Sequence, residues 1–422
     1  MLLGAVADDF TGATDLATAL HGRGLRVAVV IEDRPVDAAR LSGLDAVVVA
    51  LKTRTAPVVD AVARSVAAVS WLRSVGAERF YVKYCSTFDS TDDGNIGPVL
   101  DAVRQQLGVD RAVVVPAFPA NGRTVYRGHL FVGGDLLEHS SMRHHPLTPM
   151  TRSRLRDLLA PQTVAPITEI PLSVVRHGVD ALRVALDGAE PGHLVVDAID
   201  DSDLVAIARA TAAHRLVSGG AGLALGFEGT PRDGGDVTSG PASFPTFTGR
   251  RLVVCGSASA ATRAQIADAA TSHPTRKVDL SAAVADPEAE AAALAAWVRG
   301  LDPDTEPVVY SVGELADVDP SGGHGSASAD AVERVLSSLV RDLVTTGDPG
   351  AAVDQVIVAG GETSGAVVTA LGVSALTIGP ALAPGVCWSA ATTDTGRDVA
   401  IVLKSGNFGA LDLFSSAWGV IS

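Results

Sequence analysis

The first half of the 422-residue chain alternates short apolar runs with longer amphipathic segments. The apolar runs, which predict buried strands, are Leu3–Ala7, Val27–Ile31, Ala46–Leu51, Phe80–Tyr84, Ala112–Val115 and Leu194–Asp197. The amphipathic segments, which predict helices, are Ala13–Arg23, Val58–Ser74, Ile96–Leu107 and Asp203–Leu216. Continuous apolar strands that alternate with amphipathic helices are typical of a parallel sheet covered on both faces. The pattern therefore predicts an α/β domain.

A second α/β domain is predicted after a stretch without periodicity. Residues 229–249 are rich in Gly, Pro, Ser and Thr, which is typical of a linker. Further strands are predicted at Arg251–Cys255, Pro307–Tyr310, Gln355–Val358, Ala375–Ile378 and Val399–Leu403. We expect two domains, 1–228 and 250–422, each a largely parallel sheet flanked by helices. Residues 320–329 predict a surface loop.

Composition narrows the classes of partner. Hydrophobic residues make up 47% of the chain and aromatic residues 4%, so the cores must be built from Ala, Val and Leu. The formal charge of −15 argues against a nucleic-acid partner, although it does not exclude a nucleotide. No apolar run has the length of a membrane span, so no membrane association is expected. Three widely spaced cysteines predict reduced thiols in a cytoplasmic protein. The oligomeric state is left open, a homo-oligomer included.

The segment from Tyr81 to Gly97 carries the densest set of polar groups after a predicted strand. It presents Lys83, Cys85, Ser86, Thr87 and Asp89 before a helix pattern opens at Ile96. In open α/β sheets, ligands bind at the carboxyl ends of the strands. An ammonium, hydroxyls and a carboxylate suit a small, polyhydroxylated anion. A single turn of this kind could equally be a polar helix cap.

Three other strand ends in the first half carry similar side chains. Asp8 and Asp9 follow the first strand, Arg54 follows the third, and Asn121 follows the fifth. Adjacent acids are unfavourable unless they meet a cation, a metal or hydroxyl donors, and one of them could serve as a general base. Alternatively, Asp9 and Thr11 cap the next helix; we expect one of the two acids to do so. The repetition at one sheet edge favours a ligand site, in which Arg54 and Lys83 suit a carboxylate.

Lysine is rare in this chain. Of 33 basic residues only four are lysines, at positions 52, 83, 277 and 404. Lys52, Lys83 and Lys404 lie at or just after the ends of apolar runs. This placement indicates positions at which a compact ammonium is preferred to a guanidinium.

The second half carries turns suited to phosphate. VCGSAS (residues 254–259) and IVAGGETSG (357–365) each read as a strand, a small-residue turn and a helix start, and LKSGNFG (403–409) as a strand and a turn. Backbone N–H groups in such turns can approach phosphate oxygens closely. Three of them in one domain predict a nucleotide cradle. No GxxxxGK[ST] motif occurs, so a P-loop is excluded. We assign the glycine-rich segment GGAGLALG (219–226) to packing within the fold and not to ligand binding.

These motifs together resemble the four-carbon acid sugar kinases. The resemblance rests on VADDFTGATD, KYCSTFDSTDDGNIGPV, PAFPANGRTVYRGHLFVG, AGGETSGAVVTALG, IGPALAPGVCW and LKSGNFG, and the second and third segments resemble the 3-oxo-tetronate kinase branch. It implies an N-terminal acid-sugar domain and a C-terminal ATP domain, with the active site in the cleft between them. The implied ATP contacts are Ser257, Gly360, Gly361, Glu362, Thr363 and Gly406. Position 362 departs from the pattern, because many relatives have Asp there.

The implied reaction transfers the γ-phosphoryl group of ATP to the C4 hydroxyl of a 3-oxo-tetronate. The resemblance and the strand-end pattern assign Asp8, Asp9, Arg54, Lys83, Ser86, Thr87 and Asn121 to substrate binding, and Asp9 and Asp89 to catalysis. Mg²⁺ is expected with ATP, but the sequence does not show which carboxylate holds it. The alternatives are a threonate or erythronate kinase, a non-catalytic sensor of sugar acid and nucleotide, and a dinucleotide oxidoreductase.

Overall fold

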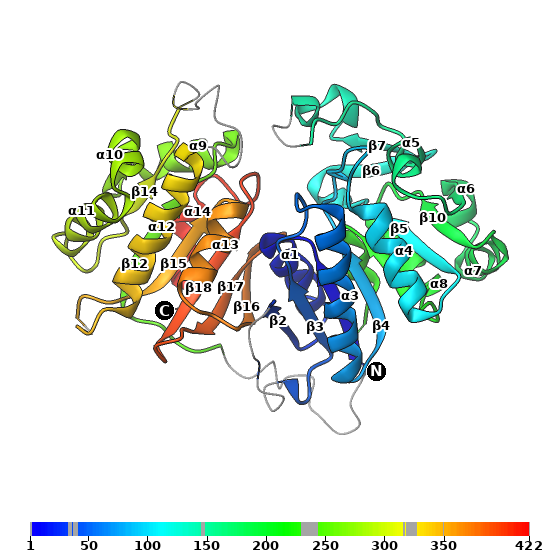
Figure 1. The fold of residues 1–422 in the computed structure, drawn as a ribbon, viewed down its shortest axis with the longest axis horizontal. Coiled ribbons are helices and arrows are strands. Elements are labelled where there is room, and N and C mark those ends of the chain that lie inside the picture. Colours follow the sequence, from blue (N-terminus) through cyan, green and yellow to red (C-terminus); the bar gives the residue numbers. More distant parts are fainter. Residues whose placement is uncertain are drawn as a thin grey trace. The chain divides into compact units, whose positions relative to one another are not determined.

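The structure is a computed structural model that describes residues 2–32, 36, 41–144, 148–228, 244–314, 317, 327–348 and 350–421. The chain divides into two compact units, and almost all described residues up to 228 form the first. Figure 1 labels the helices and strands of both units. Residues 229–243 of the predicted linker and 320–326 of the predicted loop lie outside the described residues. The predicted domain boundaries therefore stay a prediction.

The first unit is built on a parallel sheet with the strand order β2-β3-β1-β4-β11-β5-β10-β9. Its strands are β1 (Leu2–Ala7), β2 (Val27–Ile31), β3 (Ala46–Ala50), β4 (Ala77–Lys83), β5 (Arg111–Val115), β9 (Ile167–Ile170), β10 (Gly192–Val196) and β11 (Leu216–Gly219). All the recorded pairs in this sheet are parallel. The central strands are buried almost throughout, which explains their unbroken apolar sequences.

Helices cover the sheet of the first unit in two layers. Its α-helices are α1 (Phe10–His21), α3 (Val58–Ser74), α4 (Ile96–Leu107), α5 (Leu155–Leu159), α6 (Leu172–Val175), α7 (Val179–Gly188) and α8 (Asp201–Ala210). Its short 3₁₀ turns are η1 (Pro119–Asn121), η2 (Leu137–His139), η3 (Ser141–His144), η4 (Ala160–Gln162) and η5 (Ala221–Gly226). α3 packs on α4, whereas α1 and α8 both pack on η5. This arrangement leaves the carboxyl ends of the strands for the polar loops.

A small antiparallel sheet also lies in the first unit. It consists of β6 (Arg123–Tyr126), β7 (His129–Val132) and β8 (Asp135–Leu136). The Asp197 carboxylate after β10 accepts hydrogen bonds from the amides of Arg127 (2.7 Å), Gly128 (2.9 Å) and Leu172 (3.0 Å). Three amide donors from two segments anchor the β6–β7 turn to the main sheet.

The second unit has a mixed sheet with the strand order β13-β14-β12-β15-β18-β17-β16. Its strands are β12 (Arg250–Cys255), β13 (Thr275–Lys277), β14 (Val308–Tyr310), β15 (Val353–Ala359), β16 (Ala375–Ala383), β17 (Val386–Thr392) and β18 (Asp398–Lys404). The first five strands are parallel, and β17 and β16 add an antiparallel hairpin. The helices are α9 (Ala260–Ala269), α10 (Leu280–Ala285), α11 (Pro287–Arg299), α12 (Ala327–Thr345), α13 (Gly361–Ala370), α14 (Leu413–Ser416) and the 3₁₀ turn η7 (Trp418–Val420).

The α/β class is confirmed, with mostly parallel sheets flanked by helices, but one predicted helix is wrong. The predicted helix 203–216 ends as α8 at Ala210, and Leu216 begins strand β11 in the middle of the sheet. Four residues are too few for a periodicity signal, so this strand escaped prediction. The GGAGLALG segment therefore does follow a strand, although it forms the packed turn η5.

Candidate active site

Strand β1 places Asp8 between two neighbouring strand ends. Because β1 pairs with both β3 and β4, the segments after these three strands begin side by side. The Asp8 amide donates to the Lys83 carbonyl at 3.1 Å, and the Asp8 carbonyl accepts from the amides of Thr53 (2.9 Å) and Arg54 (3.2 Å). The tied backbones bring the polar side chains of all three segments together.

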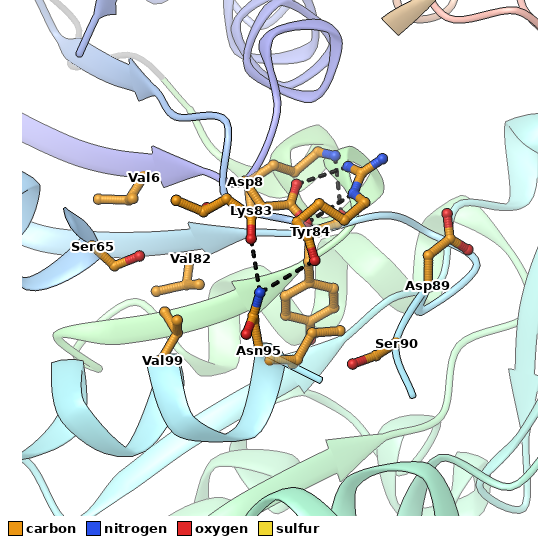
Figure 2. Close-up of a pocket in the computed structure, with 13 residues that line it drawn as sticks. Val6, Asp8, Ser65, Val82, Lys83, Tyr84, Asp89, Ser90, Asn95 and Val99 are labelled. Carbon is orange, nitrogen blue, oxygen red and sulfur yellow. Dashed lines mark hydrogen bonds and ion pairs between the residues drawn. The ribbon is translucent and has the colours of Figure 1, made fainter. Parts of the chain in front are cut away.

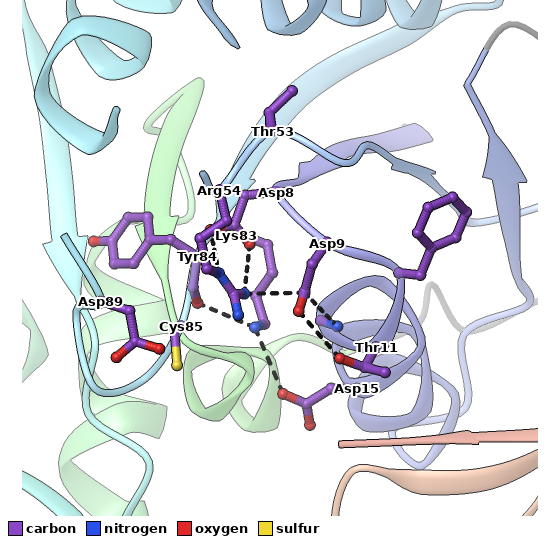
Figure 3. Close-up of polar contacts among 12 residues, drawn as sticks. Asp8, Asp9, Thr11, Asp15, Thr53, Arg54, Lys83, Tyr84, Cys85 and Asp89 are labelled. Carbon is purple, nitrogen blue, oxygen red and sulfur yellow. Dashed lines mark hydrogen bonds and ion pairs between the residues drawn. The ribbon is translucent and has the colours of Figure 1, made fainter. Parts of the chain in front are cut away.

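Arg54 joins the two adjacent acids. Its Nε and Nη2 donate to the two carboxylate oxygens of Asp8 at 3.0 and 2.7 Å, and Nη2 also lies 3.0 Å from Asp9 Oδ1. Figure 3 shows the guanidinium between the two side chains. The acid pair was expected to meet a cation, a metal or hydroxyl donors, and the structure places the Arg54 guanidinium against both acids. The ion pair of Arg54 with Asp8 is bidentate, so it fixes the orientation of the guanidinium as well as neutralising its charge.

Asp9 also caps helix α1. Its Oδ1 accepts from the Gly12 amide at 2.7 Å, and its Oδ2 accepts from the Thr11 hydroxyl at 3.1 Å. A Cβ atom at Gly12 would overlap Asp9 Oδ1, so glycine is needed at that position. The expectation that one of the two acids caps the helix is confirmed.

Lys83 pairs with an acid that the sequence analysis missed. Its Nζ lies 3.6 Å from Asp15 Oδ2 and donates to the Tyr84 carbonyl at 3.1 Å. Both side chains are buried, with 3% of Lys83 and 7% of Asp15 exposed. Asp15 lies on α1 six residues after Asp9, a spacing that does not place the two on one helix face, so the sequence carried no signal for it.

The three acids differ in how firmly they hold their charge. Burial raises the pKa of Asp8, and Arg54 and Lys83 offset this only in part. It raises the pKa of Asp15 as well, and Lys83 and Arg123 offset this only in part. Burial also acts to raise the pKa of Asp9, but Arg54, Lys83, the Gly12 amide and the Thr11 hydroxyl together lower it. Asp9 is therefore the carboxylate that stays ionised most readily. We call Asp8, Asp9, Asp15, Arg54 and Lys83 the strand-end cluster.

The segment after β4 forms a tight polar turn beside this cluster. The Thr87 hydroxyl donates to Asp89 at 2.6 Å and also contacts the Cys85 Sγ at 2.9 Å. Burial raises the pKa of Cys85 to about 12, so its thiol stays neutral near pH 7. Phe88 has a left-handed φ of 54°, which is strained for a bulky side chain, and it is fully buried edge-on against Tyr84.

A pocket in the first unit connects the cluster with this turn. Asp8, Arg54, Lys83 and Asp89 line it, among 13 residues (Figure 2). Asn95 closes one side, because its Nδ2 donates to the carbonyls of Thr53 (2.8 Å), Arg54 (3.2 Å) and Ala56 (2.9 Å). Asn95 is not among the residues that the sequence pattern assigned to the site.

Four predicted substrate residues, Asp9, Ser86, Thr87 and Asn121, lie outside the lining of this pocket. Ser86 is half-buried, and its Cβ faces Gly220. Asn121 lies in η1, where its Nδ2 is buried without a hydrogen-bond partner and its carbonyl accepts from Arg123. The charge of Arg123 acts on Asp15, which connects this loop to the strand-end cluster.

The predicted ATP residues of the second unit converge at the carboxyl ends of three strands. β15 lies between β12 and β18, so Ser257, Gly360 and Gly406 follow neighbouring strands. A Cβ atom at Gly406 would overlap the Ser257 Oγ, and one at Gly256 would overlap the Thr363 Oγ1. The three turns are thus in contact with one another.

Hydroxyl groups fix the turn after β18. The Gly406 carbonyl accepts from Ser259 Oγ at 2.6 Å and from Thr262 Oγ1 at 2.8 Å. Gly360 has a φ of 129°, which favours glycine, and precedes the first turn of α13. Gly361 and Glu362 begin this helix. We call Ser257, Ser259, Thr262, Thr363 and Gly406 the hydroxyl cradle.

Metal and membrane signals are absent from the part of the chain that the structure describes. There, no group of three or more His, Cys, Asp or Glu side chains could hold a metal ion. None of the described helices is long and apolar enough to cross a membrane. Among the described residues, Cys85, Cys255 and Cys387 form no disulfide.

Comparison with protein families assigns a binding class to each half of the chain. Residues 3–227 match a sugar-binding N-terminal domain, and residues 252–414 match a nucleotide-binding C-terminal domain. A solved structure from Salmonella typhimurium LT2, named as a tRNA synthase, has a TM-score of 0.83 and 38% identity over 99% of this chain and 98% of that one. Haemophilus influenzae HI1011 has a TM-score of 0.76 and 36% identity over 99% and 100%.

Curated relatives narrow this class to one kinase family. A 3-oxo-tetronate kinase of Burkholderia multivorans is 44% identical over 99% of this chain and 96% of its own length. The 3-oxo-tetronate kinase of Salmonella typhimurium is 40% identical over 98% of both chains. The chain belongs to the 3-oxo-tetronate kinase family, whose reaction is an ATP-dependent phosphotransfer. The predicted resemblance is confirmed.

Proposed function

We propose that this chain transfers the γ-phosphoryl group of ATP to the C4 hydroxyl of 3-oxo-tetronate. The observation that carries the proposal is the identity of 40–44% to curated 3-oxo-tetronate kinases over 98–100% of the chain. The geometry supports it, since a charged polar site lies in the unit that matches a sugar-binding domain and a glycine- and hydroxyl-rich site in the unit that matches a nucleotide-binding domain. Such a reaction needs positioning and charge neutralisation more than covalent chemistry.

Asp9 is the proposed general base for the C4 hydroxyl. It keeps its charge more firmly than Asp8 and Asp15, and its side chain is 22% exposed, compared with 7% for Asp15. Asp8 is held at both oxygens by Arg54, so its proposed role is to orient that guanidinium. Asp89, which accepts from Thr87, is proposed to shape the pocket and to receive a substrate hydroxyl.

The substrate carboxylate is proposed to meet Arg54. Lys83 is only 3% exposed and already faces Asp15, which favours a role as buried counter-charge. Ser86, Thr87 and Asn121 are proposed to bind the keto and hydroxyl oxygens. The unpartnered, buried Nδ2 of Asn121 supports this, because a buried donor is favourable only when it finds an acceptor.

The hydroxyl cradle and the turns at Ser257, Gly360–Thr363 and Gly406 are proposed to hold the ATP phosphates. Mg²⁺ that accompanies ATP neutralises the charge that develops on the phosphate oxygens. Glu362 is the only carboxylate within residues 256–259, 360–363 and 404–409, and we propose it as the contact of the second unit to this ion.

The test is a substrate panel with ADP release as the readout. We expect 3-oxo-tetronate to give a higher kcat/KM than threonate or erythronate, because a site built for a keto oxygen leaves donors unpaired with the wrong acid. Reactions without acid measure ATP hydrolysis as the control. A higher kcat/KM for a 3-hydroxy acid would contradict the proposed substrate, and binding of both ligands without ADP release would favour a sensor.

A further inference from the structure

Lys404 is a buried ammonium in the second unit with no role in the function proposed so far. It is the last residue of β18 and is 0% exposed. Its Nζ donates to Thr262 Oγ1 at 3.0 Å and to the Gly406 carbonyl at 3.1 Å. Among the described residues, no carboxylate forms an ion pair with it. An isolated buried charge is strongly unfavourable unless an anion compensates it.

The groups that surround this ammonium are neutral. Cys255 on β12 is the titratable group that acts on it, and burial keeps that thiol protonated by raising its pKa to about 12. α9 contributes the Thr262 hydroxyl, and α14 contributes the Phe414 ring, whose centroid lies 5.9 Å from Nζ. Burial lowers the pKa of Lys404 to about 8, so the proton is held weakly near neutral pH.

The same ammonium controls the shape of the hydroxyl cradle. The Gly406 carbonyl accepts from Lys404 at the end of β18 and from Ser259 and Thr262 at the start of α9, so three donors from two segments hold one oxygen. Gly406 packs so closely on Ser257 that a shift of this turn would change the phosphate site itself. A deprotonated Lys404 would lose positive charge beside that site.

We propose that Lys404 is a positioning residue for the nucleotide, and that ATP binding draws a proton onto it. The protonated ammonium holds the Gly406 turn in the ATP-binding shape and supplies positive charge near the phosphates without contacting them. A negative ligand brought near a buried base favours the charged form of that base. The inference rests on the proposed ATP site and goes beyond it by coupling the site to a proton.

The experiment is titration calorimetry of the full chain with ATP at about pH 8, in two buffers of different ionisation enthalpy. At about pH 8 the Lys404 amine is about half protonated. It therefore takes up about half a proton if it becomes fully protonated when ATP binds. Lys404→Met should lose this uptake and weaken ATP binding about tenfold or more, with the KM for the acid substrate unchanged. Lys277→Met is the matched control, because Lys277 pairs with Asp317 at the surface of the same unit.

Several results would overturn the inference. Equal proton uptake in the unchanged protein and the Lys404→Met variant would do so, as would equal ATP affinity. If the variant does not fold, the unchanged protein still decides, because ATP binding without proton uptake at about pH 8 rejects the coupling. Absence of ATP binding to the unchanged protein would reject the proposed function and this inference together.

Discussion

The strand-end cluster and the hydroxyl cradle lie at equivalent places in their own sheets but use charge in opposite ways. The cluster combines three acids with two cations, and each cation faces an acid within 3.6 Å. The cradle consists of hydroxyls, glycine and backbone, with one ammonium that forms no ion pair with a described residue. In the first unit the charged side chains are paired with one another within the protein, and this pairing fixes their orientation. In the second unit the Lys404 ammonium has no ionic partner among the described residues, and we propose that the ligand compensates its charge.

The sharpest way to break this comparison is to remove the charge of Asp9. Asp9→Asn keeps an acceptor for the Gly12 amide, so α1 stays capped. We expect kcat to fall about a thousandfold, within the range for loss of a general base, while ATP affinity persists. Asp200→Asn is the matched control, since Asp200 caps α8 in the same way. Retained turnover would remove Asp9 from catalysis.

Arg54 tests whether the cluster depends on internal pairing. Arg54→Met leaves Asp8 and Asp9 without their shared cation, so we expect the free energy of unfolding to fall by about 3 kcal/mol in a denaturant titration. Arg176→Met is the control, because Arg176 also joins two acids but is 47% exposed; its loss should stay below about 1 kcal/mol. An equal loss of unfolding free energy in Arg54→Met and Arg176→Met would contradict the view that the cluster depends on its internal ion pairs.

Gly406 tests whether the cradle depends on close packing. Gly406→Ala places a Cβ atom on the Ser257 Oγ, so we expect the Kd for ATP to rise about tenfold, since overpacking of this kind costs about 1–3 kcal/mol. Titration calorimetry measures this Kd. Gly419→Ala meets no atom within 4 Å and should bind ATP as the unchanged protein does. Unaltered affinity in Gly406→Ala would show that the turn tolerates displacement.

The smallest expected effect is a pH dependence of stability. The pKa of Lys404 is about 8 in the folded chain and 10.5 in its ordinary state, so between these values the unfolded chain binds the extra proton. Stability must therefore rise with pH across this window. From about pH 8.5 to about pH 9.5 we expect the unchanged protein to gain about 1 kcal/mol more than Lys404→Met does in denaturant titrations. Parallel curves for the two proteins would speak against a depressed pKa.

Much of this picture follows from the sequence, because strand ends can be located from apolar runs. Asp8, Arg54 and Lys83 follow three strands that pair directly, so their meeting was predictable. The turns at Ser257, Gly360 and Gly406 were predictable for the same reason. Their assigned roles stay predictions.

What the sequence could not reveal depends on contacts between distant segments. Asp15 lies inside a helix whose apolar pattern hides it, and its importance follows only from the position of Lys83. Strand β11 has four residues, and its neighbours β4 and β5 determine its place in the sheet. The absence of an ion-pair partner for Lys404 among the described residues requires the packing of β12, α9 and α14 around it.

The Asn95 side chain has a consequence for changing the substrate range of this protein. One amide group holds three carbonyls of residues 53–56, and the same residue ends the polar segment that begins at Lys83. The two loops are therefore held together as one structural unit. If residues 84–95 determine specificity, as we propose, we expect their exchange with another family member to transfer it only when residues 53–56 are exchanged as well.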